Sequence, residues 1–361
     1  MIYELTLDLL PGQERDDKLI QELILRNLAG GGTHVASSKI TAVICKKKSV
    51  DARHGQVKLH LRYAVYIDEL PPVEGDFSPK WKQAKNNKTV IIIGAGPAGL
   101  FAALQLLEDG IKPVIIERGP ETAERKIDIA ESSRTGSVGL DSNYCFGEGG
   151  AGTFSDGKLY TRSHKRGNIG RILSIFNYHG ANPNILTDAH PHIGTDKLPA
   201  IINNIKKTIL SFGGEIHFNT RCTELIIEKG AIKGVITVSS LQEKVSETFL
   251  GKAVVLATGH SAIDIYHMVA DACSKNGIPV SRALVAKPFA MGLRVEHPRV
   301  LIDDIQYHGS ERDKIFPAAE YRLTTQVDNR GVYSFCMCPG GLVVPSATAP
   351  TQIVVNGMSP S

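Results

Sequence analysis

The residues best placed for chemistry form the glycine-rich segment Gly94-Ala95-Gly96-Pro97-Ala98-Gly99. It follows an apolar run, Val90 to Ile93, and precedes an alanine- and leucine-rich run, which predicts strand, turn and helix in succession. In such a unit the first glycine permits a tight turn, the second lets the backbone approach a pyrophosphate, and the third lets the helix pack on the strand. Free N–H groups at the helix start then hold the phosphates. All six residues are candidate dinucleotide-binding residues.

A second predicted strand, Pro113 to Glu117, ends in an acid about 20 residues after the first glycine. A carboxylate there can accept both hydroxyls of an adenosine ribose and would repel a 2′-phosphate. We therefore expect an unphosphorylated ribose, with Glu117 and the neighbouring Arg118 as binding residues. The alternative is a glycine-rich turn in an ordinary βαβ unit, but the ordered strand, turn, helix, strand and acid favour the nucleotide site. This motif alone does not choose between FAD and NAD.

Two distant motifs give the chain a resemblance to flavoproteins. GAGPAG with Glu117, followed by LATG at Leu256 to Gly259, resembles the pattern of the glutathione-reductase-like FAD domain. Four stretches are similar to the uncharacterised FAD-dependent dehydrogenases, a bacterial family of NAD(P)/FAD-dependent oxidoreductases. They are FGEGGAGTFSDGKL (Phe146 to Leu159), HIGTDKLP (His192 to Pro199), LATGHSA (Leu256 to Ala262) and FCMCPGGLVV (Phe335 to Val344). The resemblance covers nearly the whole chain and implies FAD and redox chemistry, without a settled substrate.

The same resemblance adds cofactor candidates. Its second motif ends a strand beside the cofactor, which makes Ala257, Thr258 and Gly259 candidate binding residues. Cys222 and Thr223, at the beginning of another predicted strand, are expected to touch adenine through backbone groups.

One departure from the flavoprotein pattern concerns the C-terminal end. A last glycine-rich motif, often with an acid, normally returns to the FAD domain, but Gly75-Asp76 is the only Gly-Asp pair here and it lies ahead of the fold. Ile353 to Val355 is predicted to be a strand, and a domain should continue beyond it. We therefore expect the C-terminal part of the fold to be missing from this chain or supplied by another chain.

Several polar residues are candidates for the reaction itself. The loop Gly147 to Gly157 can approach a cofactor closely, and it presents Ser155, Asp156 and Lys158. Lys158 near the flavin would favour an anionic reduced ring; the alternative for this loop is a mobile surface segment. His260 could act as acid or base near neutral pH, or simply lead into a helix capped by Ser261.

Two other pairs have weaker claims. His190 and His192 lack a third ligand at suitable spacing, so no metal is expected, and we expect a loop leading to a helix cap at Thr195 or Asp196. Cys336 and Cys338 could form a redox pair, but residues two apart on a strand are near the outer limit for a disulfide. A buried strand-to-turn element is the favoured interpretation.

The elements around these residues suggest an α/β protein with three parts. Residues 1–70 form a small βαββ module, and residues 71–88, rich in proline and lysine, are expected to be a linker. Residues 89–361 form a Rossmann-like FAD/NAD(P)-binding domain, with substrate or cap insertions around 120–210 and after about 260. A helix is expected around 196–212. Because no second GxGxxG follows Lys158, NAD(P)H as an electron donor would bind outside a separate NAD domain.

Composition excludes several classes of protein. With 42% hydrophobic and 22% charged residues, the chain is globular rather than disordered or collagenous, and a net charge of +4 is too small for a general nucleic-acid binder. Scattered cysteines and an N-terminus carrying Glu4 and Asp8 favour the cytoplasm. The uncharged run Thr89 to Leu107 contains three glycines and a proline, which favours strand, turn and helix over a membrane span.

These patterns predict an FAD-dependent oxidoreductase that moves hydride or electrons between FAD and a small organic substrate. One alternative is a dinucleotide-binding protein without redox turnover. Another is a flavoprotein that binds RNA or protein through the basic run Lys46 to Lys48, although such runs are usually solvated and nucleic acid is not the expected partner. Neither the substrate nor the oligomeric state can be predicted.

Overall fold

The computed structural model describes residues 1–53, 55–71, 77–155, 157–161, 167–242, 245–288, 291–309, 316, 318–334 and 337–358. The N-terminal elements are those expected from the sequence: β1 (Ile2–Leu9), α1 (Asp17–Gly30), β2 (Ile40–Asp51) and β3 (Lys58–Ile67). The strands form an antiparallel sheet in the order β1-β3-β2. The alternation of buried and exposed residues along β1 turns one face of the sheet toward α1, whose Ile20, Ile24 and Leu28 are buried.

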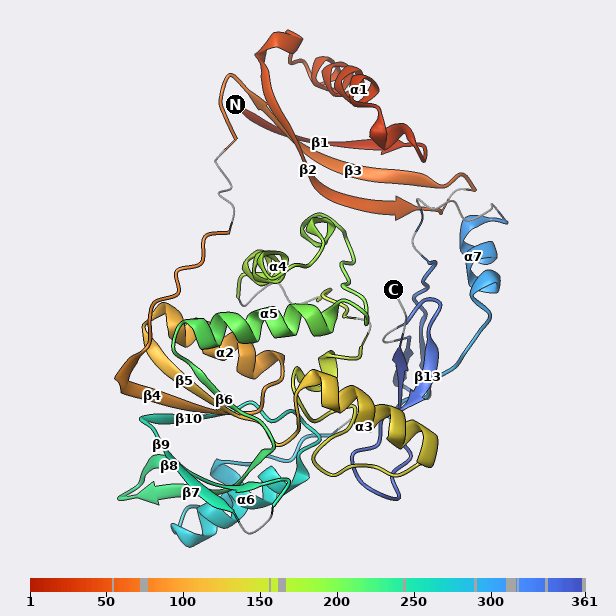
Figure 1. Ribbon diagram of the computed structural model, residues 1–361. Coiled ribbons are helices and arrows are strands. Elements are labelled where there is room, and N and C mark those ends of the chain that lie inside the picture. The colour runs from red at the N-terminus through yellow and green to blue at the C-terminus, as the bar shows by residue number, and fades with distance from the viewer. Residues whose placement is uncertain are drawn as a thin grey trace.

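The dinucleotide fold is built on a four-stranded parallel sheet with the order β10-β4-β5-β6 (Figure 1). Its strands are β4 (Lys85–Ile93), β5 (Ile111–Ile116), β6 (Glu215–His217) and β10 (Ala253–Leu256), and α2 (Pro97–Glu108) connects β4 to β5. The strands are rich in β-branched residues, as expected for a parallel sheet that is covered on both faces. This confirms the expected Rossmann-like α/β fold.

Different elements cover the two faces of the parallel sheet. On one face, α2 and α5 (Leu198–Ser211) pack together around Ile92 and Ile115. On the other face, Ile91 and Val114 meet residues of an antiparallel sheet and of α6 (Ile263–Lys275). That antiparallel sheet comprises β7 (Thr220–Glu228), β8 (Ala231–Ser239) and β9 (Ser246–Leu250).

The remaining elements lie outside these layers. The helices are α3 (Thr122–Thr135), α4 (Ile169–Tyr178) and α7 (Arg299–Tyr307), and the two hairpins pair β11 (Thr324–Val327) with β12 (Arg330–Tyr333) and β13 (Leu342–Pro345) with β14 (Val355–Met358). Short 3-10 turns occupy Gln13–Arg15, Ser37–Lys39, Gly150–Gly152, Pro183–Leu186 and Val280–Arg282. Among the described residues, no helix has the length and apolarity needed to cross a bilayer.

The stretch expected to be a linker is partly structured. Trp81 is buried in the core under α2, and the backbone N–H groups of Lys82 and Ala84 donate to Leu107 and Phe212. β4 begins at Lys85, ahead of the expected Thr89. These residues of the expected linker therefore pack against the core, because the large aromatic side chain of Trp81 is buried there despite its polar neighbours.

Two other boundaries also differ from expectation. The last strand spans Val355–Met358 rather than Ile353 to Val355, because its partner β13 pairs Pro345 with Val355 and Leu342 with Met358. The helix expected near Asp196 begins at Leu198, with Lys197 at the N-cap and no side-chain cap. Thr195 instead donates its hydroxyl to the Ser155 carbonyl at 2.7 Å.

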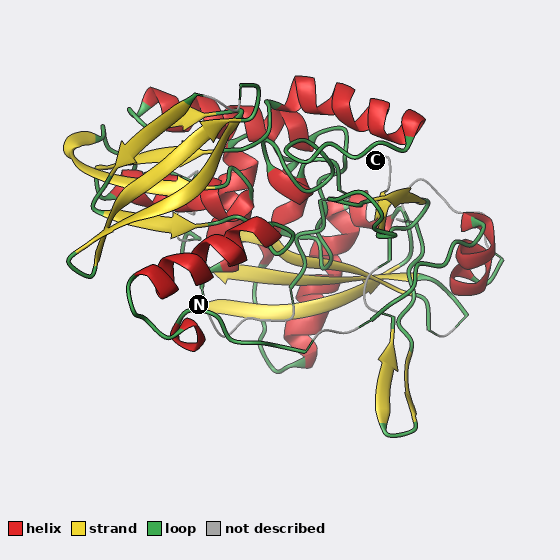
Figure 2. Cartoon of the chain, turned by 90° about the horizontal axis from the view of Figure 1, so that it is seen from below, coloured by secondary structure: helices red, strands yellow, loops and turns green. Residues whose placement is uncertain are grey.

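The N-terminal module is not an isolated unit. Its core contains Ile302, Tyr307, Phe316 and Ala319, which come from α7 and the segment that follows it. Its strand β2 also pairs with residues near Asp188, where Lys48 N donates to the Thr187 carbonyl at 3.0 Å. Figures 1 and 2 show this sheet and the strands of the dinucleotide fold as separate sheets. The boundaries 1–70, 71–88 and 89–361 stay a prediction.

Candidate functional site

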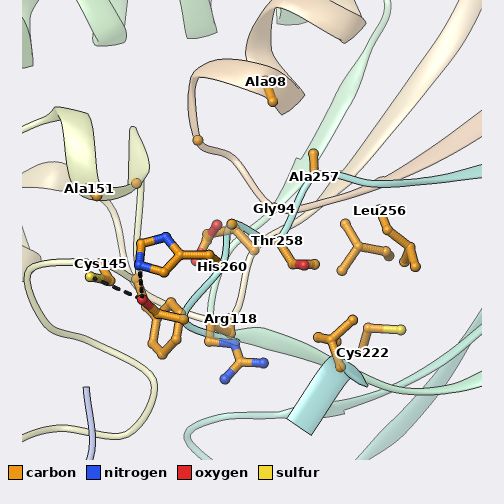
Figure 3. Close-up of a pocket in the computed structure, with 18 of the residues that line it drawn as sticks. Gly94, Ala98, Arg118, Cys145, Ala151, Cys222, Leu256, Ala257, Thr258 and His260 are labelled. Atoms are coloured by element: carbon orange, nitrogen blue, oxygen red, sulfur yellow. Dashed lines mark hydrogen bonds between the residues drawn. The ribbon is translucent and has the colours of Figure 1, made fainter. Parts of the chain in front are cut away.

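A cavity of about 590 Å³ lies where the strands β4, β5 and β10 end (Figure 3). Parallel α/β sheets bind ligands at this carboxyl edge, and the volume falls within the roughly 300–1,000 Å³ of ligand pockets. Most of the residues selected from the sequence line it: Gly94, Gly96, Pro97, Ala98, Glu117, Arg118, Cys222, Ala257, Thr258, Gly259 and His260. The structure therefore brings together segments that are far apart in the chain.

The glycines are required by close backbone contacts. Gly94 has a φ of +108°, and a Cβ atom there would lie 2.5 Å from the carbonyl oxygen of Ala257. A Cβ atom on Gly99 would overlap the carbonyl oxygen of Gly94. The turn, the start of α2 and the end of β10 can approach one another only because these two residues lack side chains.

Gly96 faces a second glycine-rich wall. A Cβ atom on Gly150 would lie 3.0 Å from the Cα atom of Gly96, so the loop beginning at Gly147 passes directly over the turn. Gly96 is the N-cap of α2, and no described side chain caps that helix end. Its first turn therefore presents backbone N–H groups and the positive end of the helix dipole to the cavity.

Glu117 holds these segments together. Its Oε2 accepts a hydrogen bond from Ala95 N at 2.8 Å, and its Oε1 accepts from Gly119 N at 3.0 Å and from Gly147 N at 2.9 Å. A carboxylate has about four acceptor positions, so about one is left for a ribose hydroxyl, where the sequence led us to expect two hydroxyls to bind. Ala95 is fully buried and contributes through its N–H group.

Arg118 forms part of the opposite wall. Its guanidinium stacks over Phe146, 4.6 Å from the ring centroid, and its Nη2 lies 2.5 Å from Asp264 Oδ2 at the start of α6. Asp141 is a second, longer partner at 3.9 Å. These contacts fix the guanidinium and join α6 to the end of β5.

Arg125 is a residue of the site that sequence reasoning missed. It is fully buried in α3 and donates to the carbonyls of Asn143, Tyr144 and Glu148 and to the hydroxyl of Thr153, at 2.7 to 3.0 Å. Burial lowers its pKa to about 10, opposed by the nearby charges of Glu117 and Glu148. The side chain therefore gives the glycine-rich loop a fixed shape.

Gly147 shows how closely that loop follows Arg125. Its φ is +108°, and a Cβ atom there would lie 2.5 Å from Arg125 Cδ. No periodic pattern marks an arginine whose partners are backbone carbonyls, so the sequence offered no signal for Arg125.

Lys158 is not among the residues that line the cavity, so its expected place near the cofactor stays a prediction. Gly157 has a φ of +67° and directs the chain toward the segment before α5, where Leu159 N donates to the Pro191 carbonyl at 2.9 Å. Lys158 Nζ therefore lies 3.6 Å from Cys338 Sγ. Ala151 and Gly152 of the same loop do line the cavity, whereas Asp156 falls outside the described residues.

The two residues expected near adenine differ in position. Cys222 lines the cavity, and burial raises its pKa to about 12. Thr223 is exposed and donates to the Ile236 carbonyl at 3.3 Å, because neighbouring side chains on a strand point to opposite faces. Its expected backbone contact with adenine stays a prediction.

His260 and Ser261 follow β10 and line the cavity beside Cys145. Ser261 Oγ lies 3.4 Å from His260 Nε2 and donates to Cys145 Sγ at 3.8 Å. Ser261 does not cap the next helix, because Ala262 is the N-cap of α6 and supplies no side-chain hydrogen bond. Cys145 was not predicted from the sequence, and its only signal is its place ahead of the glycine-rich loop.

The other pairs are placed elsewhere. His190 Nδ1 lies 2.7 Å from Glu320 Oε1, and the described part of the chain holds no cluster of three residues able to bind a metal. Cys336 lies outside the described residues, so the favoured strand-to-turn element and the alternative redox pair with Cys338 both stay untested.

Known proteins match three parts of the chain. Residues 87–129 match the family model "FAD binding domain", residues 288–361 match "FAD-dependent protein, C-terminal domain-like", and residues 1–66 match a domain of unknown function. The C-terminal stretch, where no last glycine-rich motif was found in the sequence, thus has a family match of its own.

Whole proteins are also similar to this chain. An uncharacterised protein of Clostridium beijerinckii is 39% identical over 271 residues, which are 74% of this chain and 48% of that protein. The chain thus spans about half the length of that relative. Two solved structures are similar over about half of this chain. They are the Thermovibrio ammonificans THI4 protein (18% identity, TM-score 0.36, 53% of this chain and 64% of that one) and the FAD-complexed glycerol-3-phosphate dehydrogenase of Bacillus halodurans (14%, 0.33, 52% and 37%).

The FAD-binding match covers the glycine turn, Glu117 and Arg118, and the other match covers the C-terminal segment. These matches confirm the flavoprotein resemblance, which was inferred from Gly94 to Gly99 and from the more distant motifs. Residues 87–129 are thus similar to an FAD-binding domain family, and residues 288–361 to the C-terminal domain-like family of FAD-dependent proteins.

Proposed function

We propose that this protein is an oxidoreductase that binds FAD in the cavity and exchanges hydride or electrons with a small organic substrate. The observation that carries the proposal is the meeting of the glycine turn, the glycine-rich loop and the end of β10 around one cavity, within a chain that has an FAD-binding domain. NADH or NADPH is the proposed electron donor.

The residues present fit a dinucleotide. Gly94 and Gly96 have no side chains, so a pyrophosphate can approach their backbone. The uncapped start of α2 leaves N–H groups free to bind it. Glu117 and Arg118 suit an adenosine, with Cys222 in the wall beyond them, and Ala257, Thr258 and Gly259 complete the cavity. When bound, FAD would supply the redox chemistry, and the protein would supply position, hydrogen bonds and a route for protons.

His260 is the proposed acid or base at this site, because it lines the cavity and its ring contacts a hydroxyl there. We also propose that the protein works in the cytoplasm. The described cysteines Cys45, Cys145, Cys222 and Cys273 are free thiols, as a reducing compartment favours.

The test is the visible absorbance spectrum of the purified chain, followed by anaerobic addition of NADH or NADPH. The expected result is a flavin spectrum that bleaches on reduction. Bound flavin that neither nucleotide reduces would favour the dinucleotide-binding alternative without turnover by these donors. A colourless protein that takes up no added FAD would overturn the proposal for this chain.

A matched pair of variants locates the bound cofactor. A Cβ atom on Gly96 would contact Gly150 Cα at an ordinary 3.8 Å, so Gly96→Ala should fold but fill space that the pyrophosphate needs. We expect it to weaken FAD binding roughly tenfold or more. Gly30→Ala, where a Cβ atom meets nothing within 4 Å, should bind FAD as the wild type does.

A further inference from the structure

The wall of the cavity brings together a thiol, a hydroxyl and an imidazole. Cys145 comes from the loop after α3, and His260 and Ser261 come from the segment between β10 and α6. Ser261 Oγ lies 3.8 Å from Cys145 Sγ and 3.4 Å from His260 Nε2, and Figure 3 shows Cys145 and His260 close to each other in the cavity wall. Two segments more than a hundred residues apart thus place three groups able to exchange protons in one row.

We propose that Cys145 is a reactive thiol of this cavity, with Ser261 and His260 as its proton relay. The thiol proton passes to Ser261 Oγ while the Ser261 hydroxyl proton passes to His260 Nε2. A thiol and a neutral imidazole thereby become a thiolate and an imidazolium, and no further reagent is needed. In the charged state His260 Nε2–H would donate to Ser261 Oγ, and the Ser261 hydroxyl would donate to the thiolate.

The surroundings of two other described thiols differ. Cys222 lines the same cavity, but burial raises its pKa to about 12, so it stays a protonated thiol. Burial also raises the pKa of Cys45, which lies in β2 and contacts the Lys47 carbonyl. Cys145 instead has a hydroxyl donor and an imidazole behind it, and it faces open space that a small molecule can enter. The matching ligand class is a small electrophile that carries a leaving group: the thiolate bonds to its carbon or sulfur, and the bond from that atom to the leaving group breaks.

The test is alkylation of the full chain by iodoacetamide across a range of pH, with each cysteine followed by peptide mass spectrometry. The thiolate sulfur bonds to the probe carbon, and iodide leaves. Near neutral pH we expect Cys145 to react roughly tenfold faster than Cys45. Ser261→Ala and His260→Asn should each remove most of this advantage and move the pH profile of Cys145 upward. Ser274→Ala, which removes a hydroxyl from α6 far along the helix, is the control and should change nothing.

Cys45 in the same digest reports unfolding, because a misfolded variant would expose it and speed its alkylation. Unchanged rates and pH profiles for Cys145 in both relay variants would overturn the proposal. Added FAD separates this inference from the proposed function. If FAD slows alkylation of Cys145 while the variants have no effect, the cofactor site stands and the relay fails. If FAD gives no protection while the variants do slow the reaction, the relay stands and the cofactor proposal fails.

Discussion

The dinucleotide fold and the N-terminal module are stabilised in different ways. In the first, β4, α2 and β5 follow one another directly in the chain and pack on one another, so that the glycine turn is determined by neighbouring residues. In the second, a strand, a helix and two strands form a sheet whose core is completed by Ile302, Tyr307, Phe316 and Ala319. One region is thus built from local sequence, and the other depends on a segment far downstream.

The largest expected effect tests the local region. Gly99→Ala would place a methyl group against the carbonyl oxygen of Gly94, a backbone atom that can yield only if the turn itself shifts. We expect a loss of about 4 kcal/mol in the free energy of unfolding, measured by urea denaturation. Gly30→Ala is the control and should change stability by less than about 1 kcal/mol. Equal stability of the two variants would mean that strand and helix pack less closely than described.

Arg125→Met should cost nearly as much and should also affect the cofactor. The substitution leaves buried carbonyls and the Thr153 hydroxyl without their donor, each at a cost of about 1 to 3 kcal/mol, partly relieved by water or rearrangement. We expect a net loss of about 3 kcal/mol, together with weaker FAD binding measured by fluorescence titration.

Arg125→Lys separates the two roles of this residue. It keeps the charge but cannot reach every carbonyl, so it should recover stability more than it recovers FAD affinity. Full affinity in Arg125→Met would show that the glycine-rich loop keeps its shape without the guanidinium.

Phe316→Ala tests the packing of the segment after α7 on the N-terminal module. Phe316 is buried and stacks on Tyr307 with ring centroids 5.1 Å apart, so its removal leaves a cavity between the downstream segment and the N-terminal sheet. We expect a loss of about 3 kcal/mol in the free energy of unfolding, within the range for buried aromatic side chains.

Two probes follow the unfolding of this variant. The transition should appear in far-ultraviolet circular dichroism before it appears in the fluorescence of Trp81, the single tryptophan, which lies in the dinucleotide core. Ile305→Ala, at an exposed position on α7, is the control. Coincident transitions by both probes would show instead that the two regions unfold as one unit.

The same contrast explains what the sequence could predict. The roles of Gly94 to Gly99 and of Glu117 could be predicted because they depend on a strand, a turn and a helix that are adjacent in the chain. The structure places Gly94, Gly96 and Glu117 at the cavity. Arg125 could not be found, since its partners are carbonyls that any residue carries. The contact of Lys158 with Cys338 could not be predicted either, because it depends on the direction that the chain takes at Gly157. The packing of Phe316 on the N-terminal sheet likewise left no trace in either segment alone.

The smallest expected effect concerns acid pH. His179 is buried beside Trp81, with ring centroids 5.5 Å apart, and burial lowers its pKa below the ordinary 6.5. Below pH 6.5 the unfolded chain binds a proton at His179 more readily than the folded chain does. The free energy of unfolding therefore falls as the pH drops toward the pKa of His179 in the folded chain, and this residue changes it little above about pH 7. Trp81 fluorescence during urea denaturation should therefore show a midpoint that decreases between about pH 7 and pH 5. His179→Gln should reduce that slope even if it lowers stability at every pH, because it loses part of the contacts to the Ile175 carbonyl and the Thr208 hydroxyl. An unchanged slope in His179→Gln would mean that other groups cause the loss of stability at acid pH. Acid sensitivity would then no longer distinguish the dinucleotide fold from the N-terminal module.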